Sequence, residues 1–283
     1  MKREDRRFIG IVACIVCALT AALAIAGCSS GSGSSSTTTA ASSASADTSS
    51  YTTVESGKLI VASDLAYPPL ESVPDGGGDP VGFDVDLMNA LAGKLGLTCE
   101  YLPAQKFDSI VPTIKQGGKA DVGCSSFTIT DERKEEIDFT DSYMDSNQGL
   151  VTKSDATATT VDALNVAGKQ IAVQSGTTGE EWAQENLPNA TVVPLDDAIQ
   201  AMTGVQTGLY DACVADLPVM KYLCNNSYTD LKVSIEIPTG EQYGIVVSKD
   251  NPGLTAALNT ALQELKDDGT IDSLEEKWFG STM

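Results

Sequence analysis

The chain has 283 residues, seven cysteines and no histidine, and its 18 Lys and Arg against 39 Asp and Glu give a net charge of −21. Without histidine it can form no Ser-His-Asp triad, no Cys-His nucleophile pair and no zinc site with histidine ligands. A chain this acidic repels phosphate backbones, so we expect no nucleic-acid partner. Hydrophobic residues make up 42%, which is enough for a packed core.

The first 27 residues follow the pattern of a secretory signal. Residues 1–7 carry four basic side chains, and residues 8–27 are continuously apolar or small. The segment ends in Ile25-Ala26-Gly27-Cys28, which resembles a bacterial lipobox, where the cysteine is lipidated and the chain is cut before it. We therefore predict a lipoprotein signal peptide at 1–27 and a lipid on Cys28. An uncleaved membrane helix is the alternative, because about 20 apolar residues can span a bilayer.

A low-complexity segment follows Cys28. Seventeen of the 25 residues from 29 to 53 are Ser or Thr, and Asp47 is the only charged residue among them. Such a composition cannot form a core, so residues 28–57 are predicted to be a flexible tether between the lipid and the folded part.

From residue 58 onward, short β-branched runs alternate with helical patterns. In chain order, strands are predicted at 58–63, 98–103, 120–124, 170–173, 191–194 and 212–216, and helices at 83–95, 108–116, 180–186, 196–207, 254–265 and 271–279. This alternation predicts an α/β fold with mostly parallel sheets that are covered by helices on both faces.

Two Gly-x-x-Asp turns, which end at Asp121 and Asp211, stand in equivalent places. Each follows a predicted helix and precedes an apolar strand, and the two lie 90 residues apart. One such turn is an ordinary connection, but the matching order indicates two lobes built on one plan.

The run Gly-Phe-Asp-Val-Asp-Leu at 82–87 resembles the signature of family 3 of the extracellular solute-binding proteins, the amino-acid receptors of ATP-driven importers. Segments 125–133, 174–179, 211–216 and 265–279 are also typical of that family. The resemblance covers about residues 58–280. It implies a two-lobed, periplasmic-binding-protein-like fold in which two hinge strands join the lobes and let them close on a ligand.

The resemblance also implies an organisation and a set of partners. Lobe 1 would comprise 58–146 and 245–283, and lobe 2 would comprise 147–244. The partners would be a free amino acid, an ABC permease in the cytoplasmic membrane and, through the lipid on Cys28, the membrane itself. We expect an extracytoplasmic monomer that binds without catalysis and has no cofactor or metal.

A zwitterionic amino acid requires one cation, one anion and a shaped wall, because an unpaired buried charge is costly. Arg133 is the candidate cation, since a guanidinium pairs with a carboxylate in two-pronged fashion; the alternative is a surface ion pair with Glu136 or a neighbouring acid. Asp216 follows a predicted strand and matches the family position that receives the ligand ammonium. Its alternative role is a helix N-cap before Pro218.

Other candidates lie beyond the carboxyl ends of predicted strands, where ligands of open α/β sheets bind. Hydroxyl and backbone N–H groups of Ser125, Ser126 and Thr128 are expected to hold the ligand carboxylate. Thr178 matches a family position that gives a backbone N–H, although a glycine-rich turn before a helix would explain it equally. Thr130 is expected to begin a helix.

Three further residues match the family's side-chain pocket. Tyr67 and Phe107 would sandwich the ligand side chain, and Asp64 would contact a polar or basic group. The alternative for Phe107 is plain core. Leu70 stands where many relatives carry an aromatic residue, and we expect it to alter one wall of the pocket.

The predicted function is capture of an amino acid, polar or basic by preference, between lobes that only the ligand bridges. Two alternatives are kept. The first is a cyclohexadienyl-type dehydratase on the same fold, and the second is a ligand-sensing module read by a partner protein. Free thiols are expected at Cys99, Cys124, Cys213 and Cys224, with a Cys213–Cys224 disulfide as the alternative.

Overall fold

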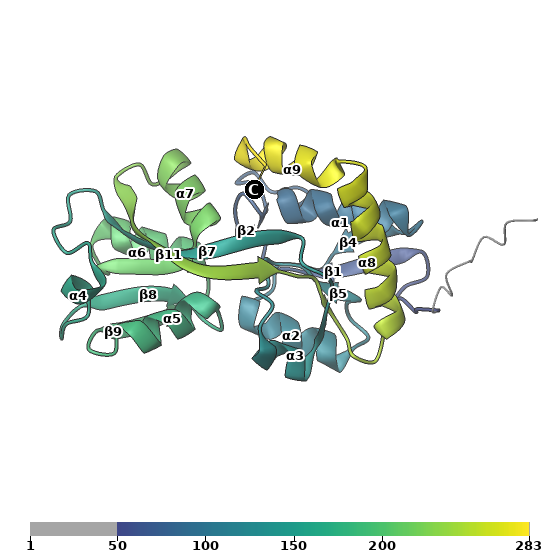
Figure 1. Ribbon diagram of the computed structural model, residues 1–283, viewed down its shortest axis with the longest axis horizontal. Helices are drawn as coiled ribbons and strands as arrows, with labels where there is room; N and C mark the ends of the chain where they lie inside the picture. Colours follow the sequence, from purple (N-terminus) through teal and green to yellow (C-terminus); the bar gives the residue numbers. More distant parts are fainter. Residues whose placement is uncertain (1–49, 283) are drawn as a thin grey trace, which may run out of the picture. The chain divides into compact units, whose positions relative to one another are not determined.

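The computed structural model describes residues 50–282, and two five-stranded sheets divide them into two lobes (Figure 1). The predicted signal peptide, Cys28 and the tether up to residue 49 lie outside the described residues. In the part of the chain that is described, no helix is long and apolar enough to cross a membrane.

The sheet of lobe 1 has the strand order β4-β1-β5-β12-β6, with parallel pairing among the first three strands and antiparallel pairing beyond them. A two-stranded hairpin leads from β1 to the first helix. The strands of this lobe are β1 (Lys58–Ala62), β2 (Ala66–Tyr67), β3 (Glu71–Ser72), β4 (Thr98–Tyr101), β5 (Val122–Gly123), β6 (Asp138–Phe139) and β12 (Val246–Val247). Its helices are α1 (Phe83–Lys94), α2 (Phe107–Gln116), α3 (Asp131–Glu136), α8 (Pro252–Asp267) and α9 (Thr270–Phe279).

The sheet of lobe 2 has the strand order β9-β8-β10-β7-β11, which repeats the plan of lobe 1: parallel pairing among the first three strands, followed by two antiparallel pairings. Its strands are β7 (Met144–Lys153), β8 (Gln170–Gln174), β9 (Thr191–Leu195), β10 (Ala212–Asp216) and β11 (Leu231–Tyr243). Its helices are α4 (Val161–Leu164), α5 (Thr178–Asn186), α6 (Ala198–Thr207) and α7 (Leu217–Asn226). The predicted two-lobed α/β fold is confirmed.

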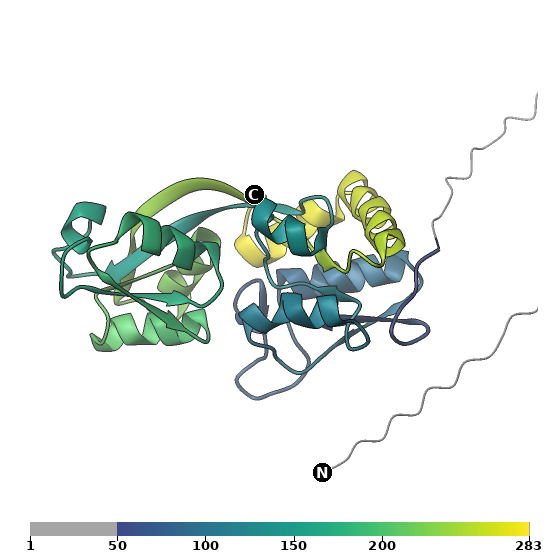
Figure 2. The ribbon, with the colours of Figure 1, turned by 90° about the horizontal axis from the view of Figure 1, so that it is seen from below.

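The central strands of both sheets are buried on both faces, as their continuous apolar sequences predict. In β1, Leu59 and Val61 belong to one hydrophobic cluster, and Ile60 and Ala62 belong to another on the opposite face. Alternate residues of a strand point to opposite faces, so each face of the lobe 1 sheet has its own core. Figure 2 shows the helices of each lobe layered about its strands.

The two Gly-x-x-Asp turns do the same structural work in each lobe. Asp121 donates its backbone N–H to the carbonyl of Ile60 at 2.8 Å and accepts the N–H of Ile60 on its carboxylate at 2.7 Å. Asp211 makes the same reciprocal pair with Gln170, both bonds at 2.9 Å. Each aspartate thereby fixes the start of the third parallel strand against the first.

Strands β7 and β11 run from one lobe to the other and pair along their length, from Met144 opposite Tyr243 to Lys153 opposite Leu231 (Figure 1). Two register shifts interrupt the ladder. These two strands stand where the resemblance implied a hinge, and the lobe boundaries at 146/147 and 244/245 remain a prediction.

Two details differ from or complete the sequence-based picture. Residues 50–57 were predicted to end the flexible tether, but they pack on lobe 1: Tyr51 contacts the core, the Thr52 carbonyl accepts from Asn251, and Val54 donates to Asp121. The low-complexity composition gave no sign of this packing, because the partners lie far along the chain.

The four described cysteines are all free thiols, so no Cys213–Cys224 disulfide is formed.

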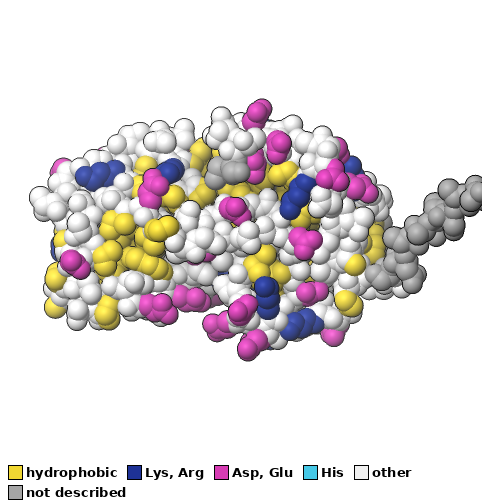
Figure 3. All heavy atoms as spheres, in the orientation of Figure 1, with side chains coloured by type: hydrophobic (Ala, Val, Ile, Leu, Met, Phe, Trp, Pro, Cys, Tyr) yellow, Lys and Arg dark blue, Asp and Glu magenta, His cyan; other side chains and the backbone are white. Residues whose placement is uncertain are grey.

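On the face in Figure 3, acidic side chains are spread over both lobes and the fewer Lys and Arg are scattered among them. No basic patch gathers on this face, in keeping with the composition.

Candidate functional site

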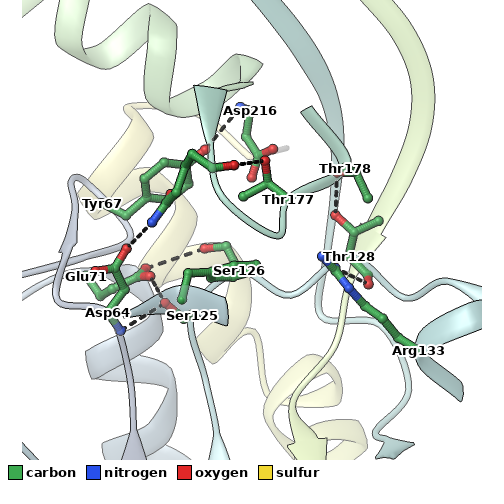
Figure 4. Close-up of a pocket in the computed structure, with 12 residues that line it drawn as sticks. Asp64, Tyr67, Glu71, Ser125, Ser126, Thr128, Arg133, Thr177, Thr178 and Asp216 are labelled. Carbon is green, nitrogen blue, oxygen red and sulfur yellow. Dashed lines mark hydrogen bonds between the residues drawn. The ribbon is translucent and has the colours of Figure 1, made fainter. Parts of the chain in front are cut away.

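One small cavity lies between the lobes, and all nine predicted ligand-binding residues line it (Figure 4). Its volume, measured as the space open to the centre of a water-sized sphere, is about 20 Å³, room for roughly one water molecule. Lobe 1 contributes Asp64, Tyr67, Glu71, Phe107, Ser125, Ser126, Thr128 and Arg133, and lobe 2 contributes Gln174, Thr177, Thr178 and Asp216. The sequence did not single out Glu71, Gln174 or Thr177.

Arg133 reaches the cavity from the first turn of α3. The helix begins as predicted, because the Thr130 hydroxyl accepts the backbone N–H of Arg133 at 3.1 Å. The guanidinium donates to the Thr128 carbonyl at 2.8 Å and, across the cleft, to the Gly176 carbonyl at 3.0 Å. Burial lowers the pKa of Arg133, but a guanidinium stays protonated at any ordinary pH.

The alternative for Arg133, a surface ion pair with Glu136, is not formed. Glu136 pairs with Lys115 at 2.8 Å instead. The guanidinium carbon of Arg133 lies 5.6 Å from the ring centre of Phe107 and 5.8 Å from that of Phe127. Its two hydrogen bonds use two of five N–H donors, which leaves donors for a carboxylate.

Asp216 ends β10 on the opposite side of the cavity. It occupies the N-cap position of α7, as the alternative role predicted, but its side chain makes no capping hydrogen bond. The carboxylate instead accepts from Gln148 at 2.6 Å and from the Tyr243 hydroxyl at 2.7 Å. Burial, together with the nearby charge of Glu241, raises the pKa of Asp216 to about 7.

Two polar residues of the hinge strands, Gln148 on β7 and Glu241 on β11, complete this side of the site. Glu241 Oε2 accepts from the hydroxyls of Thr128 at 3.1 Å and Thr178 at 3.2 Å, and from Gln148 at 3.0 Å. Gln148 is fully buried and lies opposite Asp216 in the β7–β10 ladder. In the sequence, Gln148 is marked only by being a polar residue directly before residues 149–152, a stretch that is buried in the structure.

At the other end of the cavity, Asp64 and Glu71 present buried carboxyl groups. Gln174 donates to Asp64 Oδ2 at 2.7 Å across the cleft, and burial raises the pKa of Asp64 to about 6. Ser125 donates its hydroxyl to Glu71 Oε1 at 2.6 Å and accepts the Asp64 backbone N–H at 3.2 Å. These bonds connect the loop after β1, the β3 strand and the loop after β5 (Figure 4).

The aromatic residues combine both roles that were considered for them. Phe107 stacks on Phe127 with ring centres 4.5 Å apart, belongs to an apolar cluster and also lines the cavity. The Tyr67 hydroxyl accepts the backbone N–H of Asp216 at 3.0 Å. The expectation for Leu70 is wrong: Leu70 is fully buried in the core, and its neighbour Glu71 lines the cavity. Leu70 ends the turn before β3, and Glu71 is the first residue of that strand.

The expectation that only a ligand bridges the lobes is also wrong. Direct hydrogen bonds cross the cleft, among them those of Arg133 with Gly176, Gln174 with Asp64, and Asp216 with Tyr67. Lys106 and Asp196 add an exposed ion pair at 2.7 Å. These contacts form because polar side chains that are shut away from water need partners.

The chain matches the family model of the bacterial extracellular solute-binding proteins, family 3, over residues 59–281. The "Putative ABC transporter arginine-binding protein 2" of Escherichia coli K12 is 35% identical over 222 residues, 77% of this chain and 89% of that protein. The "Lysine/arginine/ornithine-binding periplasmic protein" of the same strain is 32% identical, over 82% and 90% of the two chains.

Solved structures give the same picture. A mutant of ArgBP from T. maritima is 36% identical with a TM-score of 0.74, over 80% of this chain and 96% of that one. The ancestral amino acid-binding protein AncCDT-1, described as a precursor of cyclohexadienyl dehydratase, is 36% identical with a TM-score of 0.73, over 79% and 96%.

Proposed function

The chain belongs to the bacterial extracellular solute-binding proteins of family 3, and from this we propose that it binds one free amino acid between its lobes and delivers it to an ABC importer. Relatives that cover most of the chain are named as binding proteins for arginine, cystine, or lysine, arginine and ornithine. They are binding proteins rather than enzymes.

The backbone groups of the amino acid are assigned to opposite lobes. Arg133, with the hydroxyl or N–H groups of Ser125, Ser126, Thr128 and Thr178, takes the carboxylate, and Asp216 takes the ammonium. Two observations support this assignment: Arg133 has spare donors that face a shared cavity, and Asp216 is a buried carboxyl with no cationic partner among residues 50–282.

The proposed ligand class is inferred from the charged groups that line the cavity. Its lining holds three acidic groups, Asp64, Glu71 and Asp216, against one cation, Arg133. The ligand ammonium compensates Asp216, and the ligand carboxylate compensates Arg133. Asp64 and Glu71 then remain without a counter-charge. A buried carboxyl is compensated best by a cation. We infer that the ligand is a basic amino acid whose side chain lies between Tyr67 and Phe107.

Opening and closing of the lobes is part of the proposal. A free amino acid is larger than the cavity, so the lobes or their side chains must move apart to admit it. The ligand then adds its own contacts to both lobes and stabilises the closed state over the open one.

The remaining features follow the sequence. A signal peptide at 1–27, a lipid on Cys28, a tether before the folded part, lobe 1 at 58–146 with 245–283 and lobe 2 at 147–244 describe an extracytoplasmic monomer tied to the membrane, close to its permease. Labelling of cells with a radioactive fatty acid, for the native chain and Cys28→Ala, tests the anchor.

A panel of the twenty amino acids in a thermal-unfolding assay tests the ligand. A ligand at 100 times its dissociation constant stabilises by about 2.7 kcal/mol. We expect arginine, lysine or ornithine to give the largest shift. A panel with no shift, or with the largest shift from an acidic amino acid, contradicts the proposal. Turnover of a cyclohexadienyl acid by the purified protein would favour the dehydratase alternative, for which the likeness to AncCDT-1 is the specific ground.

A further inference from the structure

A pair of carboxyl groups lies at the back of the cavity, behind the loop that follows β5. Glu71 on β3 and Asp84 in the first turn of α1 are each 1% exposed. Both accept from the same hydroxyl, that of Ser126, at 3.4 Å for Glu71 and 3.3 Å for Asp84. Two acids on one buried hydroxyl are close enough to repel each other strongly when both are ionised.

No cation compensates this pair. Among residues 50–282, no Lys or Arg forms an ion pair with Glu71 or Asp84. The titratable groups that face the pair are neutral or acidic: Tyr67 from β2, Asp64 after β1, Tyr101 from β4, Cys124 after β5 and Tyr143 before β7.

The hydrogen bonds to the pair are too few for two charges. Asp84 Oδ2 accepts from the Ser126 N–H at 2.9 Å and from the Tyr143 hydroxyl at 3.0 Å, and the Cys124 thiol is a further, weak donor to this carboxyl group. The buried Oδ1 has no other partner among the described residues. Glu71 accepts only from the hydroxyls of Ser125 and Ser126. A buried carboxylate without a counter-charge takes up a proton instead.

The two acids differ in access. Glu71 lines the cavity, whereas Asp84 does not. Only Glu71 can therefore meet a group that enters the cavity, and Asp84 acts on the site through it.

We infer, on the basis of the proposed function, that Glu71 and Asp84 share at least one proton when no cation is bound, and that the cationic side chain of a basic amino acid replaces a proton of this pair. The proton leaves Glu71 for solvent and the ligand cation takes its place beside the carboxylate, so the net charge of the site is unchanged. Binding of a basic ligand is then coupled to release of a proton, while binding of a neutral isostere is not.

The electrostatics of the pair agree with this geometry. Burial and the neighbouring Asp84 raise the pKa of Glu71 well above its usual range, and burial raises the pKa of Asp84 to about 6. Both shifts favour a proton on the pair, as its geometry does.

Calorimetric titration of the native protein tests the inference without any variant. Arginine and its neutral isostere citrulline are titrated near pH ~7 in two buffers of different ionisation enthalpy. The difference in released protons cancels any proton lost from Asp216, because both ligands carry the same ammonium. We expect arginine to release about one proton more than citrulline, so its affinity relative to that of citrulline should weaken by up to about tenfold for each unit by which the pH is lowered.

Three variants locate the proton. In Glu71→Gln the excess release by arginine should vanish, whereas it should persist in Asp64→Asn, which removes the other acid at that end of the cavity. Asp86→Asn is the matched control, because Asp86 lies on α1, the helix that carries Asp84, but pairs with Lys277 outside the site.

Arginine that binds without excess release, or excess release that survives Glu71→Gln and disappears in Asp64→Asn, overturns this inference and leaves the proposed function standing. Failure of every basic amino acid to bind refutes the proposed ligand class and the inference together, and is recognised by the absence of heat.

Discussion

The two lobes share a scaffold but not a chemistry. Their sheets have the same strand order, and Asp121 and Asp211 lock the same pair of strands in each. Yet lobe 1 contributes the guanidinium of Arg133 and the buried acids behind the cavity, whereas lobe 2 contributes Asp216 and the threonine turn before α5. The frame is therefore repeated, whereas the loops after equivalent strands carry different groups, which our proposal assigns to the two ends of one dipolar ligand.

The largest expected effect comes from removing the cation of lobe 1. Arg133→Ala takes away the two-pronged partner of the ligand carboxylate, a loss of about 2–5 kcal/mol, or at least ~30-fold in affinity. Arg133→Lys should recover only part, because an ammonium cannot make the paired contact. Isothermal titration measures both, and exposed Lys134→Ala serves as the control. Full affinity in Arg133→Ala would refute its role.

The next effect comes from the anion of lobe 2. Asp216→Asn keeps the shape but loses the charge opposite the ligand ammonium, and we expect about 10- to 100-fold weaker binding for every amino acid that binds. Glu236→Gln, on the exposed side of β11, is the matched control. An affinity of the asparagine variant within about twofold of native would end this assignment.

The same variant has an opposite effect on the protein without ligand. The pKa of Asp216 is raised in the folded state, so its contribution favours folding at low pH and is lost as pH rises from about 4 through about 7. Asp216→Asn removes that loss. At pH ~8 it should therefore melt a few degrees higher than the native chain, with a smaller difference at pH ~5. Equal melting temperatures at both values would argue against a raised pKa.

The two strand locks offer a comparison within the scaffold. Asp121 is buried and holds two backbone N–H groups, so Asp121→Asn should destabilise the protein by about 1–3 kcal/mol. Asp211 is more exposed; burial raises its pKa, but the bonds from Lys169 and Gln170 outweigh this and leave the pKa below its usual value. Asp211→Asn should cost less, and its cost should fade in acid below about pH 4. Chemical denaturation of both variants measures whether the two aspartates contribute equally to the free energy of unfolding.

The smallest effect is expected at the exposed ion pair across the cleft. Lys106 and Asp196 are 62% and 58% exposed, and pairs of this kind contribute about 0–1 kcal/mol. Lys106→Ala should change ligand affinity by less than about fivefold, and less still at high salt. A larger effect would mean that closure depends on surface charge rather than on the cavity.

Most parts of the site that sequence reasoning found lie just after a strand, at its end or in the first turn of a helix. Arg133 sits beside the Thr130 cap, and Asp216 ends a five-residue buried strand. Such positions are fixed by local patterns, so a motif is enough to place them. Gln148 and Glu241 lie inside strands and have no such signal, because they bind residues that are 68 and 113 positions away along the chain.

By itself, the sequence determined the two-lobed α/β frame, the repeated strand locks and the nine residues that meet at one cavity, since these depend on hydrophobic periodicity, turn chemistry and a family motif. Only the tertiary structure decided that the lobes bond directly to each other, that Glu71 rather than Leu70 faces the cavity, and that Glu71 and Asp84 share one hydroxyl. The physical reason is that burial and charge–charge distance are properties of the packed chain, and a buried carboxyl differs from an exposed one only through the neighbours that folding brings to it.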